Sequence, residues 1–193
     1  MKTQNVAILL FTVLFFSASF ALANERQTLI SGEVNHGGFG GWEVTGTQMG
    51  DNNVLMTGGR GAWLLNHSFY LGGAGYGSAF SVGDTGKHVG YGGLLLGFIG
   101  SPNSLVNYGF DVILGAGGIA NPNDYADNTN CDHNADTFLV VEPGVNVALN
   151  VFKYGKINLG ASYRFVSRSD DSVFTNDMLS GASVKASMIF GKF

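Results

Sequence analysis

The chain has 193 residues and a formal net charge of −4, and only 12% of its residues are charged. That fraction is about half of the roughly 25% found in soluble globular domains, so the chain has too few charges to cover a soluble surface. The acidic balance argues against a nucleic-acid partner, because phosphate binding needs cationic side chains, and the single cysteine, Cys131, excludes an internal disulfide.

The first 23 residues have the layout of an export signal. Met1-Lys2 is a short basic start, an apolar run follows from Val6 to Phe16, and Ala21-Leu22-Ala23 is an A-x-A cleavage site. We expect residues 1–23 to be a cleaved signal peptide and residues 24–193 to form one mature domain.

Eight segments of the mature chain show strand patterning. They cover residues 30–49, 54–65, 69–77, 88–100, 106–119, 138–151, 156–166 and 182–193. In the seventh segment the apolar residues are Ile157, Leu159, Ala161, Tyr163 and Phe165, and the polar residues include Asn158, Ser162 and Arg164. Strand side chains alternate between two faces, and about 9–11 residues of a tilted strand cross a bilayer. We expect the apolar set to face lipid and the polar set to face the lumen of a barrel.

The connections between these segments alternate in length. Those at 66–67, 101–104 and 153–155 are short, and those at 78–87, 121–136 and 168–179 are long, with 50–53 as a short exception. Bacterial outer-membrane barrels have an even number of strands, short periplasmic turns and longer extracellular loops. The sequence therefore predicts an all-β fold, an eight-stranded antiparallel up-and-down transmembrane β-barrel with both chain ends on the periplasmic side.

The export signal, the eight alternating strands, the turn pattern and the terminal Phe193 together resemble small outer-membrane barrels of the OmpA and OmpX kind. The resemblance implies a monomer in the bacterial outer membrane, in contact with outer-membrane lipid and lipopolysaccharide. It also implies recognition by the barrel-assembly machinery, which in that family reads an aromatic C-terminal residue. Here Phe193 is out of phase with the alternating positions 182, 184, 186, 188 and 190.

Six charged residues are candidates for the lumen. They are Glu33, Arg60, Asp111, Glu142, Arg164 and Lys185. A basic side chain on the lipid side costs roughly 2–4 kcal/mol at mid-membrane, and an eight-stranded barrel is just wide enough for side chains to fill it. We expect Arg60 to meet one or more of the three carboxylates, because an unpaired buried charge is costly. The charges then form a paired plug, or, on the alternative hypothesis, a polar relay or narrow conduit.

The sequence predicts no cofactor and no metal. Residues 115–120 match a dinucleotide fingerprint, but Asn121-Pro122 follows where a helix is required. Within the acidic segment 124–136, residues 132–136 have the opening spacing of an EF-hand loop, but Thr137 and Pro143 stand where its glycine and closing glutamate are required. Cys131 beside His133 does not define a site.

Three functions are compatible with this pattern. The favoured one is a structural or surface-interaction barrel without enzymatic activity. The second is a lipid-modifying barrel enzyme, for which Ser81, Asp84 and His88 supply a nucleophile, an orienting carboxylate and a base. The third is a soluble lipocalin-like barrel that binds a small ligand, against which the low charge content argues.

Overall fold

The computed structural model describes residues 35–82, 86–120, 136–167 and 179–193. The predicted export signal, Glu33, Asp84 and the acidic segment 124–135 lie outside this part of the chain. Within it, no helix has both the length and the apolar character that a membrane span requires.

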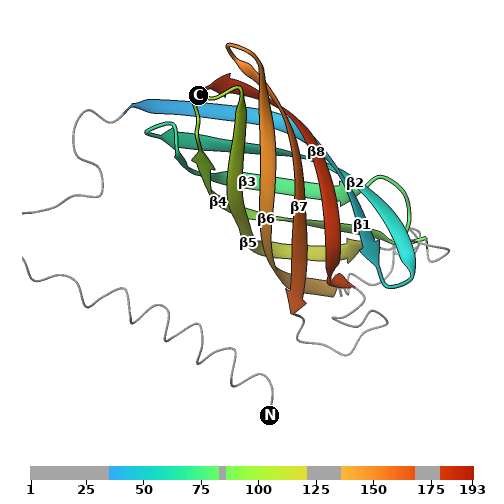
Figure 1. The fold of residues 1–193 in the computed structure, drawn as a ribbon. Coiled ribbons are helices and arrows are strands. Elements are labelled where there is room, and N and C mark those ends of the chain that lie inside the picture. Colours follow the sequence, from blue (N-terminus) through green and yellow to red (C-terminus); the bar gives the residue numbers. More distant parts are fainter. Residues whose placement is uncertain (1–34, 83–85, 121–135, 168–178) are drawn as a thin grey trace, which may run out of the picture. The chain divides into compact units, whose positions relative to one another are not determined.

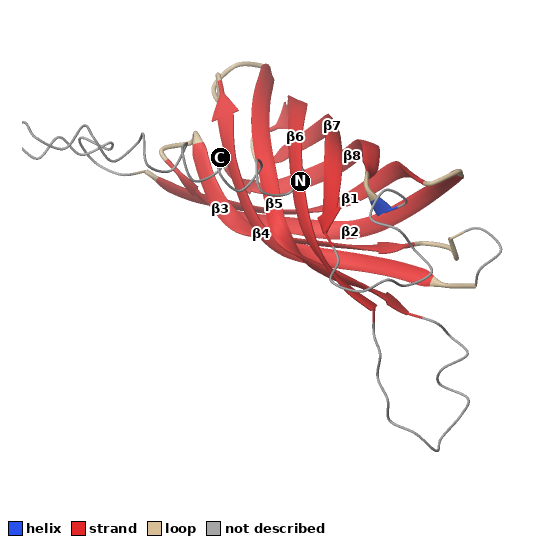
Figure 2. Ribbon diagram, turned by 90° about the horizontal axis from the view of Figure 1, so that it is seen from below, coloured by secondary structure: helices blue, strands red, loops and turns tan. Residues whose placement is uncertain are grey.

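The described residues form eight strands. They are β1 His36–Met49, β2 Asn52–Leu65, β3 Phe69–Ser78, β4 His88–Gly100, β5 Val106–Ala120, β6 Asp136–Phe152, β7 Gly155–Ser167 and β8 Gly181–Lys192. Each strand pairs antiparallel with the next, and β8 pairs back onto β1, so that the sheet closes (Figures 1 and 2). The predicted all-β, eight-stranded, up-and-down barrel is confirmed, with strand bounds within two residues of expectation except at the start of β1.

The two ends of the barrel differ in their connections. At one end, called the short-turn end here, residues 66–68, 101–105 and 153–154 link neighbouring strands. Asn66 and His67 have φ values of 51° and 60°, as the two central residues of a type I′ hairpin turn require. At the other end, called the long-loop end, the connections are 79–87, 121–135 and 168–180, together with the tight β1–β2 turn.

Side chains alternate between the wall's outer surface and the interior. On β7, Leu159 is 60% exposed whereas Arg164 is 1% exposed, which is the alternation predicted for this strand. Phe193 has the same parity as the inward-facing residues of β8. Its ring stacks on the buried ring of Phe39, with centroids 6.0 Å apart. This explains why it is out of phase with the apolar positions of β8.

The interior is not polar throughout. A cluster of buried apolar side chains lies toward the long-loop end: Met49, Val54, Met56, Val89, Ile119, Phe138, Val140 and Val166. Two residues of the connections, Val82 and Leu179, are each 1% exposed and belong to the same cluster. The buried ion pairs lie between this cluster and the short-turn end, whereas Arg164, Thr47 and Ser183 are buried polar residues beside the cluster.

Glycines on the inner surface make room for aromatic rings and neighbouring backbone. A Cβ atom at Gly58 or Gly97 would meet the ring of Tyr76 or Tyr70, and one at Gly72 would lie 2.6 Å from the Cβ of Ala62. Gly73, the next residue along β3, points outward, where the nearest atom to an added Cβ is 3.6 Å away. The inner glycines are therefore needed for close packing inside a narrow barrel.

We predict that Gly72→Ala lowers the free energy of unfolding by about 1–3 kcal/mol, because the new methyl group overpacks the interior against backbone. Gly73→Ala is the matched control, one residue away on the opposite face, and should change stability by less than about 0.5 kcal/mol. Urea unfolding of the two refolded variants measures the difference. Equal effects would contradict the assignment of the two faces.

Candidate functional site

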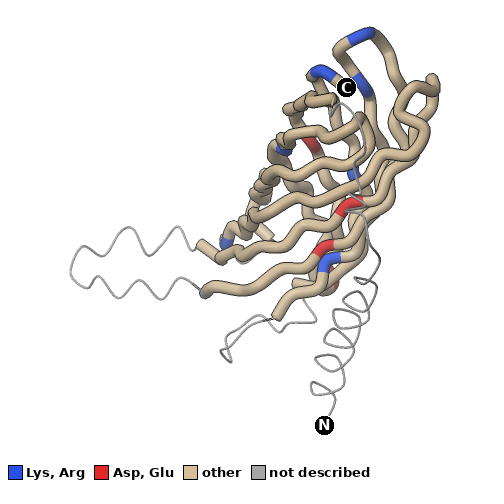
Figure 3. The backbone as a smooth tube through the Cα atoms, turned by 90° about the vertical axis from the view of Figure 1, so that its left-hand side faces the viewer, with Lys and Arg blue, Asp and Glu red and all other residues tan. Residues whose placement is uncertain are grey.

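The interior of the barrel gathers the charged side chains of the strands. Seven are buried: Glu43, Arg60, Asp111, Glu142, Lys156, Arg164 and Lys185. Three carboxylates thus share the lumen with four cations. Figure 3 shows that charged positions are sparse along the wall of the barrel.

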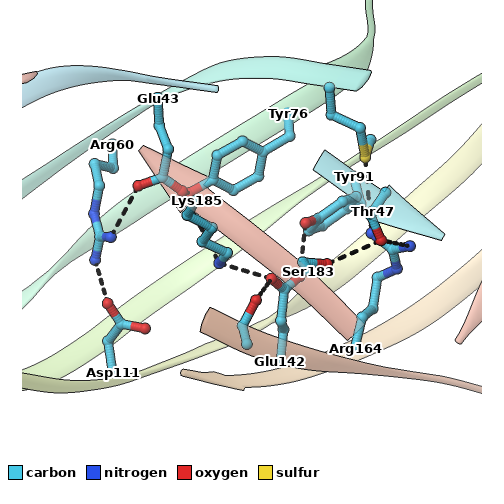
Figure 4. Close-up of polar contacts among 12 residues, drawn as sticks. Glu43, Thr47, Arg60, Tyr76, Tyr91, Asp111, Glu142, Arg164, Ser183 and Lys185 are labelled. Atoms are coloured by element: carbon cyan, nitrogen blue, oxygen red, sulfur yellow. Dashed lines mark hydrogen bonds and ion pairs between the residues drawn. The ribbon is translucent and has the colours of Figure 1, made fainter. Parts of the chain in front are cut away.

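Arg60 is the centre of the first group of contacts (Figure 4). Its guanidinium lies 2.6 Å from an Asp111 oxygen and 3.2 Å from a Glu43 oxygen. Tyr70 donates its hydroxyl hydrogen to Asp111 at 3.2 Å, and Tyr76 donates to Glu43 at 2.8 Å. Charge-assisted hydrogen bonds of this kind are the strong ones, and here they connect β1, β2, β3 and β5 across the lumen.

A second group surrounds Glu142. Its carboxylate lies 2.7 Å from Lys185 Nζ and accepts hydrogen bonds from Tyr91 at 2.6 Å and Ser162 at 2.7 Å. Lys185 Nζ also lies 4.0 Å from Glu43, so it joins the two groups into one network. With its oxygens paired in this way, Glu142 can remain ionised although it is fully buried.

Arg164 is stabilised without a carboxylate among the residues that the structure describes. Its Nε donates to the backbone carbonyl of Leu179 at 2.9 Å, and Nη2 donates to Thr47 Oγ1 at 3.2 Å. Its guanidinium carbon lies 5.2 Å from the centre of the Tyr91 ring, which is within cation–π range. Arg164 thus ties β7 to β1 and to the connection that precedes β8.

The structure brings together some of the sequence-predicted lumen residues. Arg60 meets Asp111, as expected, but its second carboxylate is Glu43 and not Glu142, which pairs with Lys185. Glu33 lies outside the described residues. Arg164 contacts Leu179 and Thr47 and none of the predicted carboxylates that the structure describes.

Two buried charges were not predicted from the sequence. Glu43 lies on a glycine-rich strand where Phe39 and Trp42 fall on opposite faces, so the apolar side was hard to identify. Glu43 and Glu33 both have odd residue numbers, so strand alternation assigns them to the same face. Because Glu33 was predicted to face the lumen, this parity could have assigned Glu43 to the lumen as well. Lys156 shares the even positions of Asn158, Ser162 and Arg164, but its place next to a turn concealed its burial.

The enzymatic candidates are only partly described. His88 Nδ1 lies 3.4 Å from Ser78 Oγ, at the long-loop end of β3 and β4. The same Ser78 oxygen accepts a hydrogen bond from the backbone N–H of Val89 at 3.1 Å. This bond links the end of β3 to the start of β4. Among the described residues, no three His, Cys, Asp or Glu side chains are grouped closely enough to hold a metal ion.

Comparison with known proteins identifies the fold. No protein-family model and no curated protein matches this sequence. The crystal structure of Neisserial surface protein A has a TM-score of 0.62 at 11% identity, covering 84% of this chain and 100% of that one. The N-terminal β-barrel domain of OprF from Pseudomonas aeruginosa has a TM-score of 0.56 at 11% identity, covering 81% and 97%. The resemblance to small eight-stranded outer-membrane barrels of the OmpA and OmpX kind is confirmed at the level of fold.

We predict that Arg60→Ala lowers the free energy of unfolding by about 3–5 kcal/mol, because Glu43 and Asp111 lose the cation between them. Lys153→Ala, at an exposed turn, is the control and should change stability by less than about 0.5 kcal/mol. Urea unfolding in detergent micelles measures both. A variant as stable as the parent would mean that these ion pairs contribute nothing to the fold.

Proposed function

We propose that the protein is an outer-membrane β-barrel with a closed lumen and a structural or surface-interaction role. The observation that carries the proposal is that charged side chains lie inside the barrel and apolar side chains outside, the opposite of a soluble protein. Among the outward-facing side chains that the structure describes on the eight strands, Lys192, near the end of β8, is the only lysine, arginine, aspartate or glutamate. The other charged side chains described on the strands are buried.

The outer wall has the composition of a lipid-facing surface. Large apolar side chains are exposed on every strand, including Trp42, Leu55, Leu71, Leu94, Phe110, Val145, Leu159 and Val184. Soluble monomers rarely expose a contiguous apolar patch of more than a few hundred Å². A lipocalin-like soluble barrel would have the opposite arrangement, with its charges outside, so the wall argues against that alternative.

Aromatic side chains gather near the ends of the strands. Toward the short-turn end, Phe69 and Phe98 have ring centroids 5.2 Å apart, and those of Phe152 and Phe190 are 6.1 Å apart. Toward the other end, the Tyr163 and Phe165 centroids are 4.8 Å apart. Aromatic girdles at both interfaces are typical of outer-membrane barrels, and strands of 10–17 residues exceed the roughly 9–11 needed to cross.

The contacts inside the closed barrel favour a structural role over an enzymatic one. Among the described residues, the three buried carboxylates are paired with Arg60 and Lys185, and Ser78 beside His88 is engaged with backbone. A closed sheet has no free edge strand that requires a partner, which favours a monomer. In this proposal, outer-membrane lipid and lipopolysaccharide contact the wall, the barrel-assembly machinery inserts it, and the longer connections face outward.

The two tryptophans of the chain test the membrane location without any substitution. Trp42 and Trp63 are 59% and 50% exposed on the outer wall. We predict that both are quenched in vesicles of phosphatidylcholine with brominated acyl chains. Trp63, close to the short-turn end, should respond most to bromine near the headgroup, and Trp42 to bromine placed deeper. Single Trp→Phe variants separate the two signals, and emission equal to that in unbrominated vesicles would exclude a lipid-facing wall.

A further inference from the structure

The short-turn end of the barrel is positively charged in the part of the chain that the structure describes. Its turns, 66–68, 101–105 and 153–154, contain Lys153 and no aspartate or glutamate. Lys156 and Lys192 lie on the adjoining ends of β7 and β8, and Figure 3 shows basic positions gathered near the C-terminal end. Cationic side chains gathered at one end of a barrel raise the local concentration of anions there.

Lys156 is a buried cation whose described partners are uncharged. Its Nζ lies 3.1 Å from Asn107 Oδ1 and 4.0 Å from the centre of the Phe193 ring. Asn107 is held in this orientation because its NH₂ group donates to the carbonyls of Ser101 and Ser104 at 2.7 and 2.8 Å. Neither contact supplies the negative charge that a buried ammonium group normally requires.

Two further polar groups in the same place lack partners. Arg60 uses its two terminal nitrogens on Glu43 and Asp111, while its Nε has no hydrogen-bond partner. Asn158 is 5% exposed, and its Oδ1 is also without one. A half turn of that amide would present its NH₂ group instead, so Asn158 can act as a donor here.

These groups line one cavity of about 30 Å³. Its lining residues include Arg60, Lys156, Asn107, Asn146 and Asn158, and none of them is an aspartate or a glutamate. Asp111, which lies nearby, is engaged by Arg60, Tyr70 and the Asn146 NH₂ group at 3.2 Å. The volume exceeds the roughly 10–15 Å³ that one water molecule needs, so a small ion fits.

We propose that this cavity is a binding site for a small inorganic anion of the halide class, held between the ammonium group of Lys156 and Nε–H of Arg60, with the amide of Asn158 as a further donor. The anion supplies the charge that Lys156 lacks and accepts a hydrogen bond from Arg60 Nε, a donor that is otherwise buried without a partner. The site shares Arg60 with the ion-pair network but uses its Nε–H, which that network does not engage. It does not depend on where the barrel is located in the cell.

The test uses the full-length mature protein in detergent, with sodium chloride replaced stepwise by sodium gluconate at constant ionic strength. Because a ligand that binds only the folded state stabilises it, the midpoint of heat unfolding should be higher in chloride, by about 2–4 °C. Lys156→Met should lose the chloride-dependent rise, and the exposed Lys153→Met should keep it.

A second variant keeps the proposal testable should Lys156→Met fail to fold. Asn158→Asp places a carboxylate beside Lys156, so it should fold in either salt and lose the chloride effect. Bromide soaked into crystals of the parent protein should give an anomalous peak in the cavity. No such peak, or the same chloride effect in Asn158→Asp as in the parent, would show that the cavity holds water and would overturn the proposal.

Discussion

The bridge that Arg60 makes between Glu43 and Asp111 is the interaction on which the interior depends. It joins β2 to β1, its neighbour, and to β5, three strands away, so it spans the lumen as well as the wall. Lys185 does the same from β8, toward Glu142 on β6 and Glu43 on β1. A slip of one residue along any of these strands would turn its charge outward. The cross-lumen ties therefore select one register for the whole barrel.

The neighbouring packing follows from the same constraint. The hydroxyls of Tyr70, Tyr76 and Tyr91 each donate to a network carboxylate, so their rings are buried inside the barrel. Glycines at Gly58 and Gly97 leave the room for two of these rings. The high glycine content is thus partly a consequence of placing tyrosines inside. Buried apolar side chains cluster toward the long-loop end, and the rings of Phe193 and Phe39 stack at the other.

Much of the fold could be predicted from the sequence, because strand alternation is local. The pattern in residues 156–166 identified which side chains point inward, and the turn residues marked most strand ends. The pairing inside the lumen could not be predicted, because it depends on how the strands are staggered around the barrel. Arg60 and Asp111 are 51 residues apart, and nothing near either residue indicates that they meet. Glu43 was missed for a local reason, since glycines on β1 obscure its apolar face.

Single-channel conductance in planar bilayers tests most directly whether paired charges close the lumen. The parent protein should give no discrete current steps, because its network fills the middle of the barrel. Arg60→Ala should also remain closed, since Glu43 and Asp111 would draw in water and neighbouring side chains instead of leaving a continuous path. Discrete openings in the parent, or in a folded Arg60→Ala barrel, would mean that the charges gate a conduit and would contradict the account.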